Sequence, residues 1–346
     1  MGERRRSKIA KSMILLLPLL LLSSPAVALN LTLEPIKPIP KTLKVDPERA
    51  VLGEKLFFES KLSGDNSINC AHCHELDEKG GADGLKHSFG VEGREGLANS
   101  PTVFNAALNF AQFWDGRAAT LEDQAAGPIT AHAEMASTWP QVIAKLKADR
   151  EYSKAFARLF DDGITEANIK HAIAEFERTL ITPNSRFDRY LEGDETAITE
   201  EEKQGYQTFK EYGCTACHQG MNVGGNLFQV LGVMGDYYQD HEIENSADLG
   251  RFNVTGNDDD RHRFKVPSLR LTVLTAPYFH NGVYASLYDA IRTMAKYQLG
   301  REIPDADVRS IIRFLYTLPG EYRGESLEPK ERTHLIFPLK KGRSQL

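Results

Sequence analysis

Apolar residues recur at helical spacing in several separate segments of the chain. The first such stripe contains Leu52, Leu56 and Phe57. It follows Asp46 and Pro47, a capping residue and a first-turn proline that are typical of helix starts. The same pattern follows three threonines that can cap a helix, at positions 138, 165 and 199, and it returns at 287–297 and 305–318. The sequence therefore predicts amphipathic helices in both halves of the chain.

Two long stretches, 79–101 and 219–267, lack a periodic apolar pattern. The first is rich in glycine, and no part of the chain shows a convincing alternation of apolar and polar residues, as a half-buried strand would. Irregular loops of this length in a compact domain usually line a site or wrap a cofactor. We therefore expect a mainly α fold with long loops, with a boundary at 183–185, where Pro, Asn and Ser interrupt the helical pattern.

The N-terminus carries the pattern of an export signal. Five basic residues between positions 4 and 11 precede an apolar segment at 13–22, and small residues follow, ending in Ala-Val-Ala at 26–28. This pattern predicts a signal peptide at 1–28 that is cleaved after Ala28, since the apolar segment is too short to span a bilayer. An uncleaved anchor is the alternative.

Composition agrees with an ordinary globular protein. Of the 346 residues, 41% are hydrophobic and 26% are charged, which argues against a disordered, collagen-like or multi-span membrane protein. The net charge is −6, and it becomes −10 when the signal peptide leaves with five basic residues and one acidic residue. An acidic exported protein suits a basic partner, and nothing here indicates binding to nucleic acid.

All four cysteines belong to two copies of one motif, CAHCH at 70–74 and CTACH at 214–218. C-x-x-C-H is the attachment signature of c-type haem, because two thiols add to the two vinyl groups of one haem and the adjacent histidine reaches the iron. A zinc site, a redox pair of thiols and structural disulfides are the alternatives, and none of them requires the histidines. The predicted attachment residues are Cys70, Cys73, Cys214 and Cys217, and the predicted iron ligands are His74 and His218.

Each haem iron also needs a second axial ligand or an open position. Methionine raises the potential of a histidine-ligated haem, whereas an open position allows a substrate to bind. Beyond the signal segment the methionines are Met135, Met221, Met234 and Met294. Met221 is too close to His218 to reach around the haem. Met234 and Met294 both remain candidates, although a methionine on a helix is more often part of a core.

Several further segments resemble the bacterial di-haem cytochrome c peroxidases. In the first half these are NSPTVFN at 99–105, QFWDGR at 112–117 and QAAGP at 124–128, with Glu134 downstream. In the second half they are GRF at 250–252 and TAPYFHNG at 275–282, with Met294 at the family's spacing after His280. The resemblance covers about residues 45–325.

This resemblance implies two cytochrome c-like haem domains, at 29–184 and 185–325, and a C-terminal tail at 326–346. The haem on His74 would be the low-potential peroxidatic haem. The haem on His218 would be the high-potential electron-transfer haem, with Met294 as its sixth ligand. Glu134 matches the family's distal acid–base carboxylate and Gln124 its distal glutamine. Without the resemblance, Glu134 would be read as a solvated surface residue.

The resemblance also implies roles at the junction of the two domains. Trp114 matches the tryptophan between the haems, although a buried tryptophan is as easily a core residue. Asn99, Thr275 and Pro277 match the residues that supply oxygen ligands to a calcium ion, and such oxygens suit a hard cation. His280 would be a structural residue or a partner of a haem propionate, and the family suggests a homodimer.

One position departs from the family's pattern. Many of these peroxidases carry a histidine eight residues before the asparagine that corresponds to Asn99, and it ligates the peroxidatic iron at rest. Here that position is Val91, which cannot ligate iron. His87 could substitute if the loop shifts, but an exposed loop residue is its expected state. We therefore expect a peroxidatic haem that is five-coordinate or water-bound before any reduction.

The sequence therefore indicates a periplasmic di-haem peroxidase. It would reduce hydrogen peroxide to water with electrons from a small cytochrome c or a cupredoxin. One alternative is a di-haem enzyme that oxidises protein side chains; such enzymes use a tyrosine where this chain has Met294. The other is a non-catalytic di-haem electron carrier, which would have no use for Gln124 and Glu134.

Overall fold

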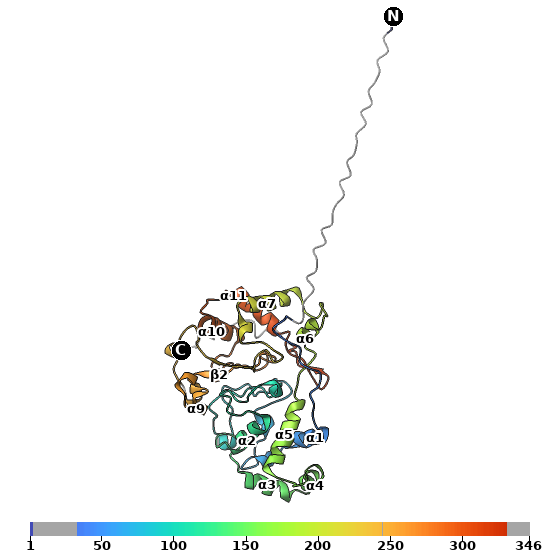
Figure 1. Ribbon diagram of the computed structural model, residues 1–346, viewed down its shortest axis with the longest axis vertical. Coiled ribbons are helices and arrows are strands. Elements are labelled where there is room, and N and C mark those ends of the chain that lie inside the picture. Colours follow the sequence, from blue (N-terminus) through green and yellow to red (C-terminus); the bar gives the residue numbers. More distant parts are fainter. Residues whose placement is uncertain (3–32, 244, 331–346) are drawn as a thin grey trace, which may run out of the picture.

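The computed structural model describes residues 1–2, 33–243 and 245–330. Residues 3–28 of the predicted signal peptide and 331–346 of the predicted tail lie outside this part. Within it the fold is mainly α, as predicted, with eleven α-helices and four strands of two or three residues (Figure 1). No helix in these ranges is long and apolar enough to cross a membrane.

The elements have the following bounds. The α-helices are α1 (Pro47–Phe57), α2 (Leu121–Thr130), α3 (Trp139–Ala148), α4 (Arg150–Leu159), α5 (Glu166–Thr179), α6 (Arg186–Leu191), α7 (Glu200–Glu211), α8 (Tyr237–Asp240), α9 (Phe252–Thr255), α10 (Leu287–Leu299) and α11 (Asp305–Leu315). The strands are β1 (Phe228–Val230), β2 (Arg263–Lys265), β3 (Glu321–Tyr322) and β4 (Glu325–Ser326), paired antiparallel as β1–β2 and β3–β4. The 3₁₀ helices are η1 (Ser60–Leu62), η2 (Cys70–His72), η3 (Val91–Gly93), η4 (Ala106–Leu108), η5 (Cys214–Ala216), η6 (Ser246–Leu249) and η7 (Asp258–Asp260).

The predicted helix starts are confirmed by their capping contacts. The Asp46 carboxylate accepts the first free backbone N–H groups of α1, and Thr165 does the same for α5. Thr199 and Glu202 form a reciprocal capping box at the start of α7. These local hydrogen bonds explain why the sequence alone locates the beginnings of these helices.

Two helices of ten residues, α2 and α4, were not predicted. Helix α2 contains Pro128, which normally interrupts a helix because proline has no N–H to donate and crowds the preceding turn. Here Pro128 lies in the last turn of α2, so only one helical hydrogen bond is lost, at the Gln124 carbonyl. Helix α4 starts at Arg150, immediately after the Asp149 cap, so no loop separates it from α3.

Each half of the chain packs one helix before its cysteine motif against a later helix. In the first half α1 crosses α5 at Gly53, where a Cβ would lie 1.8 Å from the Ala172 carbonyl oxygen. In the second half α7 crosses α11 at Gly205, where a Cβ would lie 2.2 Å from the Ser310 carbonyl oxygen. A side chain at either glycine would separate the helices. In Figure 1, α2–α5 lie in the lower part, and α6, α7, α10 and α11 lie in the upper part.

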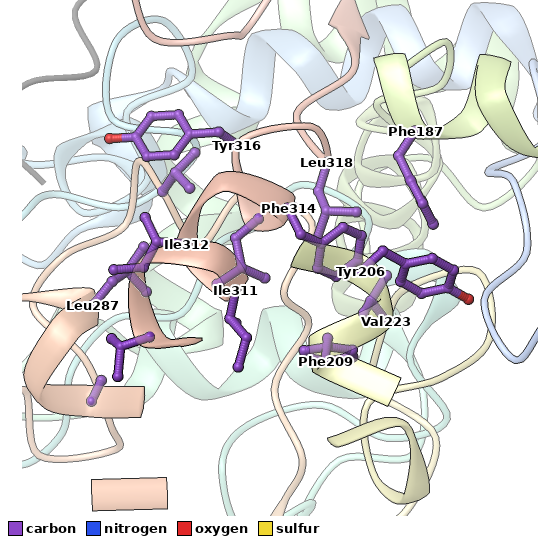
Figure 2. Packing of buried hydrophobic residues seen from close by; sticks show 14 of the residues in the cluster. Phe187, Tyr206, Phe209, Val223, Leu287, Ile311, Ile312, Phe314, Tyr316 and Leu318 are labelled. Atoms are coloured by element: carbon purple, nitrogen blue, oxygen red, sulfur yellow. The ribbon is translucent and has the colours of Figure 1, made fainter. Parts of the chain in front are cut away.

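The two largest apolar cores follow this division. One core lies among α1–α5, and the other lies among α6, α7, α10 and α11. Figure 2 shows aromatic rings from α6, α7 and α11 meeting in the second core. The Phe187 ring lies 4.7 Å from the Tyr206 ring and 4.9 Å from the Phe314 ring, in edge-to-face contacts that stabilise the packing of these three helices.

Both ends of the described chain contact the opposite half. Near the N-terminus, the Lys37 N–H donates to the Gly220 carbonyl at 3.3 Å. Near the C-terminus, the Tyr322 ring packs 4.9 Å from the Phe104 ring, and the Arg323 guanidinium pairs with Glu54 at 2.6 Å. These contacts connect the two halves, and the predicted domain bounds of 29–184 and 185–325 stay predictions.

Candidate active site

Both cysteine motifs adopt the same local backbone. In each motif a single 3₁₀ turn begins at the first cysteine, as η2 and η5. The histidine N–H then donates to the carbonyl of that cysteine, over 3.0 Å at His74 and 2.9 Å at His218. This turn holds two thiols and one imidazole in one compact loop, as attachment of a c-type haem requires.

The hydrogen bonds and the protonation state of the two histidines suit ligation of a metal through Nε2. Nδ1 of His74 lies 3.1 Å from the Gly81 carbonyl, and Nδ1 of His218 lies 3.3 Å from the Val223 carbonyl. Burial lowers both pKa values, that of His218 to about 4, so the imidazoles are neutral. A neutral ring that donates from Nδ1 keeps its lone pair on Nε2, the tautomer that binds iron.

No disulfide joins the four cysteines, which lie in two separate pairs. Among the described residues, which include all four cysteines, no group of three histidine, cysteine, aspartate or glutamate side chains is placed to hold a metal ion. The cysteines therefore do not converge on a four-cysteine zinc site. Two thiols and one imidazole at each of two places fit the haem alternative instead.

A cavity of about 440 Å³ lies beside the second motif. Cys214, Cys217 and His218 line it, and so does Met294 on α10. Most of the remaining wall is apolar and includes Phe209, Leu287, Ile291, Ile311 and Leu315. An apolar cavity with two thiols, an imidazole and a thioether fits a covalently attached haem with two axial ligands.

This cavity distinguishes the two methionines that the sequence left open. Met294 lines the cavity together with His218, whereas Met234 is 62% exposed at the surface. Met135 is buried in the core of the first half, and Met221 is 42% exposed. Of the methionines in the described part of the chain, only Met294 is therefore in a position that suits a sixth ligand for the iron held by His218.

Glu134 lies in a tight turn that follows α2. Its N–H donates to the Ala131 carbonyl at 3.0 Å, and its carbonyl accepts the Val91 N–H at 2.8 Å. The second bond ties the turn to the glycine-rich loop at 79–101. Val91 is itself buried, so this contact lies in the interior of the first half.

The carboxyl group of Glu134 lies near enough to the first cysteine motif for its charge to act on both thiols. Burial raises its pKa above the usual range, and the positive charge of Arg117 opposes this effect. Burial also raises the pKa of the Cys70 thiol to about 12 and that of Cys73 to about 11, and the nearby charge of Glu134 adds to both. Glu134 is therefore a half-buried carboxyl group near both thiols and not a fully solvated surface residue.

Gln124 lies on α2, half-buried, ten residues before Glu134. Its N–H donates to the carbonyl of Thr120, the residue that caps α2. The neighbouring Ala125 is buried in the core of the first half, which fixes the helix beneath the Glu134 turn. The structure thus places Gln124 on the helix that leads into this turn.

Trp114 and the three predicted calcium residues line the same cavity as His218. The indole N–H of Trp114 donates to the Asn99 carbonyl at 2.9 Å, and the Asn99 N–H donates to the His280 carbonyl at 2.8 Å. Asn99 comes from the first half, and Thr275 and Pro277 come from the second. The fold therefore brings the predicted junction residues together from segments far apart in the sequence.

The expectation that His87 is an exposed loop residue is wrong. Its side chain is only 9% exposed, and its Nδ1 lies 2.9 Å from a Glu95 carboxylate oxygen. The loop folds back on itself, as shown by the hydrogen bond from the Gly96 N–H to the Ser88 carbonyl. This hairpin-like return covers His87 and leaves its Nε2 buried without a partner in the described part of the chain.

His280 has a structural environment. Its Nε2 lies 2.6 Å from a carboxylate oxygen of Asp248, and its ring stacks on Phe264 at 4.1 Å. Asp115 and Arg117 form an ion pair, at 3.0 Å. These residues fix the backbone around Trp114 and the cavity.

Comparison with known proteins decides the family. A sequence profile of the di-haem cytochrome c peroxidases matches residues 47–196. The cytochrome c peroxidase Ccp of Escherichia coli (strain K12) is 49% identical over 290 residues, which are 84% of this chain but 62% of that longer protein. The cytochrome c551 peroxidase of Nitrosomonas europaea is 46% identical over 290 residues, which are 83% of this chain and 85% of that protein. This chain belongs to the di-haem cytochrome c peroxidase family.

Membership of the di-haem cytochrome c peroxidase family confirms the predicted enzyme class, an oxidoreductase of the cytochrome-c peroxidase type, and haem as its cofactor. Among solved structures, a MauG-like protein associated with microbial copper homeostasis has a similar fold. It superposes with a TM-score of 0.71 at 26% sequence identity and covers 82% of this chain and 93% of that chain.

Two buried charged side chains of this di-haem peroxidase were not found from the sequence. Glu177 on α5 is 6% exposed, and its charge adds to the raised pKa of Cys70. Lys265 on β2 is also 6% exposed and lines the cavity beside His218. A single glutamate or lysine carries no motif and is usually exposed, so only the tertiary structure reveals either residue.

Glu177 should make the stability of the protein depend on pH. Burial, assisted by Glu122, raises the pKa of Glu177 to about 8, and one oxygen of its carboxyl group has no partner among the described residues. The folded state favours the neutral acid. The contribution of Glu177 to the free energy of unfolding is therefore fully present at low pH and is lost as the pH rises through about 8. At about 1.4 kcal/mol for each pKa unit, the loss between about pH 5 and pH 9 is on the order of 3–5 kcal/mol.

Replacing Glu177 by glutamine should remove this pH dependence, since the amide keeps the shape and never ionises. Chemical unfolding of the haem-loaded protein at several pH values measures how the free energy of unfolding depends on pH. Glu78→Gln, at an exposed position, is the matched control and should retain the wild-type dependence. A Glu177→Gln protein that still loses stability between these pH values would contradict the assignment.

Proposed function

We propose that this protein is a periplasmic enzyme that reduces hydrogen peroxide to water at its first haem and receives electrons at its second. The observation that supports the proposal is the half-buried carboxyl group of Glu134, whose charge acts on both thiols of the first motif. A plain electron carrier has no need for a poorly hydrated acid at this place. The predicted signal peptide supports export.

At the first site, Cys70 and Cys73 would hold the haem, and His74 would ligate its iron. When bound, the haems supply peroxide binding and O–O cleavage at this site and electron entry at the other. The Glu134 carboxylate would take a proton from one oxygen of the peroxide and return it to the other, which leaves as water. Burial supports this role, because a raised pKa brings the group closer to the pH at which it must both accept and donate. Gln124 would orient the peroxide.

At the second site, Cys214 and Cys217 would hold the haem, with His218 and Met294 as its axial ligands. A thioether ligand raises the potential of the haem, which suits a site that accepts electrons from an external donor. Trp114 lines this cavity and is bonded to Asn99 of the first half. It therefore lies at a junction where a relay residue would be useful.

We also propose a calcium ion at the junction of the halves, held by oxygens of Asn99, Thr275 and Pro277. Carbonyl and amide oxygens suit this cation, and the three residues line one cavity. Oxygen ligands from both halves would fix the distance between the two haem sites.

The electron donor is proposed to be a small cytochrome c or a cupredoxin with a basic surface. The mature chain carries a predicted net charge of −10, so such a donor would be steered toward it. Turnover with this donor should fall when salt rises from about 10 mM to about 150 mM, because the screening length shortens from about 30 Å to about 8 Å. Turnover with a small neutral reductant at the same salt concentrations is the control. An equal response of both donors would contradict steering.

The resting state of the first haem is proposed to be open, since Val91 lacks a ligating atom. Low-temperature electron paramagnetic resonance of the fully oxidised protein tests this. We expect a high-spin ferric signal that disappears when peroxide is added. Two low-spin signals that respond to peroxide only after one-electron reduction would instead assign a resting ligand, for which the buried His87 is placed in the same loop.

Peroxide consumption with a pre-reduced cytochrome c tests the function itself. We expect two cytochromes to be oxidised for each peroxide consumed, as two-electron reduction to two water molecules requires. Peroxide consumption without net oxidation of the cytochrome, together with a stable oxidised state in its absence, would favour oxidation of protein side chains. If neither the haems nor the cytochrome responds to peroxide, electron transfer without catalysis would be the only function left.

A further inference from the structure

Lys265 is a buried cation in the cavity beside the second haem motif. Its side chain is only 6% exposed, and it lines the cavity that also contains Cys214, Cys217 and His218. The backbone holds it firmly: residue 265 pairs with Phe228 in the β1–β2 sheet, and its N–H donates to the Trp114 carbonyl at 2.7 Å.

No side chain in the described part of the chain neutralises this cation. No ion pair or side-chain hydrogen bond of Lys265 occurs within these residues, and burial alone lowers its pKa to about 8. Removing an ammonium group from water without a counter-charge is costly, and buried lysines are normally paired. The geometry thus indicates that the cavity holds an anionic group when the protein has its cofactors bound.

The cavity itself limits what that anion is. Its walls are mostly apolar, and they include the two thiols and the imidazole of the second motif and the Met294 thioether, which fit a haem. A haem has an apolar ring and two propionate carboxylates, so it can fill the cavity and supply the missing charge. A free anion would satisfy Lys265 but would leave the apolar wall unfilled.

We propose that the Lys265 ammonium group binds a propionate carboxylate of the haem attached at Cys214 and Cys217. Lys265 is then a positioning residue that fixes the haem edge next to Trp114, whose carbonyl it already contacts through its own backbone. The proposal rests on the haem-binding part of the proposed function and does not depend on peroxide as substrate.

A positive charge near the second haem favours the reduced state of that haem, because the added electron is attracted to it. Removing the charge should therefore shift the equilibrium toward the oxidised form. We expect Lys265→Met to shift this equilibrium at least tenfold, which corresponds to a midpoint potential about 59 mV lower for a one-electron couple. Lys265→Arg keeps the charge and should stay close to wild type.

The experiment is a spectroelectrochemical titration of the haem-loaded full chain at pH 7. Lys44→Met, which removes an exposed lysine, is the matched control and should leave the potential unchanged. Equal potentials for Lys265→Met and Lys44→Met would overturn the proposal, and so would an equal drop in Lys265→Met and Lys265→Arg, which would indicate altered packing. Loss of the second haem from the Met variant but not from the Arg variant would support a required charge.

The haem content of the wild type separates this proposal from the proposed function. Two haems per chain without a potential shift in Lys265→Met would reject the role of Lys265 alone. A single haem per chain, absent from the second motif, would reject both the di-haem function and the propionate contact.

Discussion

Replacement of Glu134 by glutamine is expected to lower peroxidase turnover roughly 10²–10⁴-fold, the usual contribution of a positioned acid–base group. Glutamine keeps the size of the side chain but cannot accept and return a proton. Both haems should stay attached, because Glu134 contributes to the environment of the cysteines and not to their bonds. Steady-state peroxide reduction and a single-turnover reaction with peroxide measure the effect on the chemical step.

The pH profile provides a second readout for Glu134. The carboxylate must be ionised to take the first proton, and its pKa is raised by burial. The wild-type rate should therefore fall as the pH drops through this pKa, and the Glu134→Gln enzyme should lose that limb of its profile. Glu78→Gln, at an exposed position in the first half, should match the wild type. A decrease of less than about tenfold in Glu134→Gln would reject the acid–base role.

Replacement of Met294 by histidine is expected to lower the potential of the second haem by roughly 0.1–0.3 V, within the span of about 0.8 V over which axial ligands tune haem proteins. Histidine is the stronger donor and stabilises the oxidised iron. Electron transfer from a high-potential donor then becomes unfavourable, so turnover with a reduced cytochrome c should fall by at least tenfold. Potentiometric titration and stopped-flow oxidation of the donor measure the two effects.

Met234→Leu is the matched control for this prediction, because Met234 is the other methionine that the sequence allows and is largely exposed. Its potential and turnover should equal those of the wild type. A shift in Met234→Leu together with none in Met294→His would reverse the ligand assignment. Equal potentials in all three proteins would show that the second haem does not depend on either methionine.

Local chemistry explains how much of the protein the sequence determines. Haem attachment needs two thiols and a histidine within five consecutive residues, so the motifs at 70–74 and 214–218 are readable without a structure. Helix starts are equally local, because a cap such as Thr199 bonds a backbone group only three residues away. The helical class of the fold and the placement of α1, α5 and α7 follow from such signals.

Burial and long-range proximity are decided only by the tertiary fold. His87 lies in a glycine-rich loop that reads as exposed, yet the loop turns back and covers it. Glu177 and Lys265 carry no motif, and their raised and lowered pKa values arise from neighbours that exclude water and lie far away in sequence. The choice between Met234 and Met294 is also three-dimensional, because it depends on which thioether lines the cavity beside His218. Sequence spacing determines which groups can bond a haem, whereas packing decides which of these groups are shielded from water and line the haem cavity.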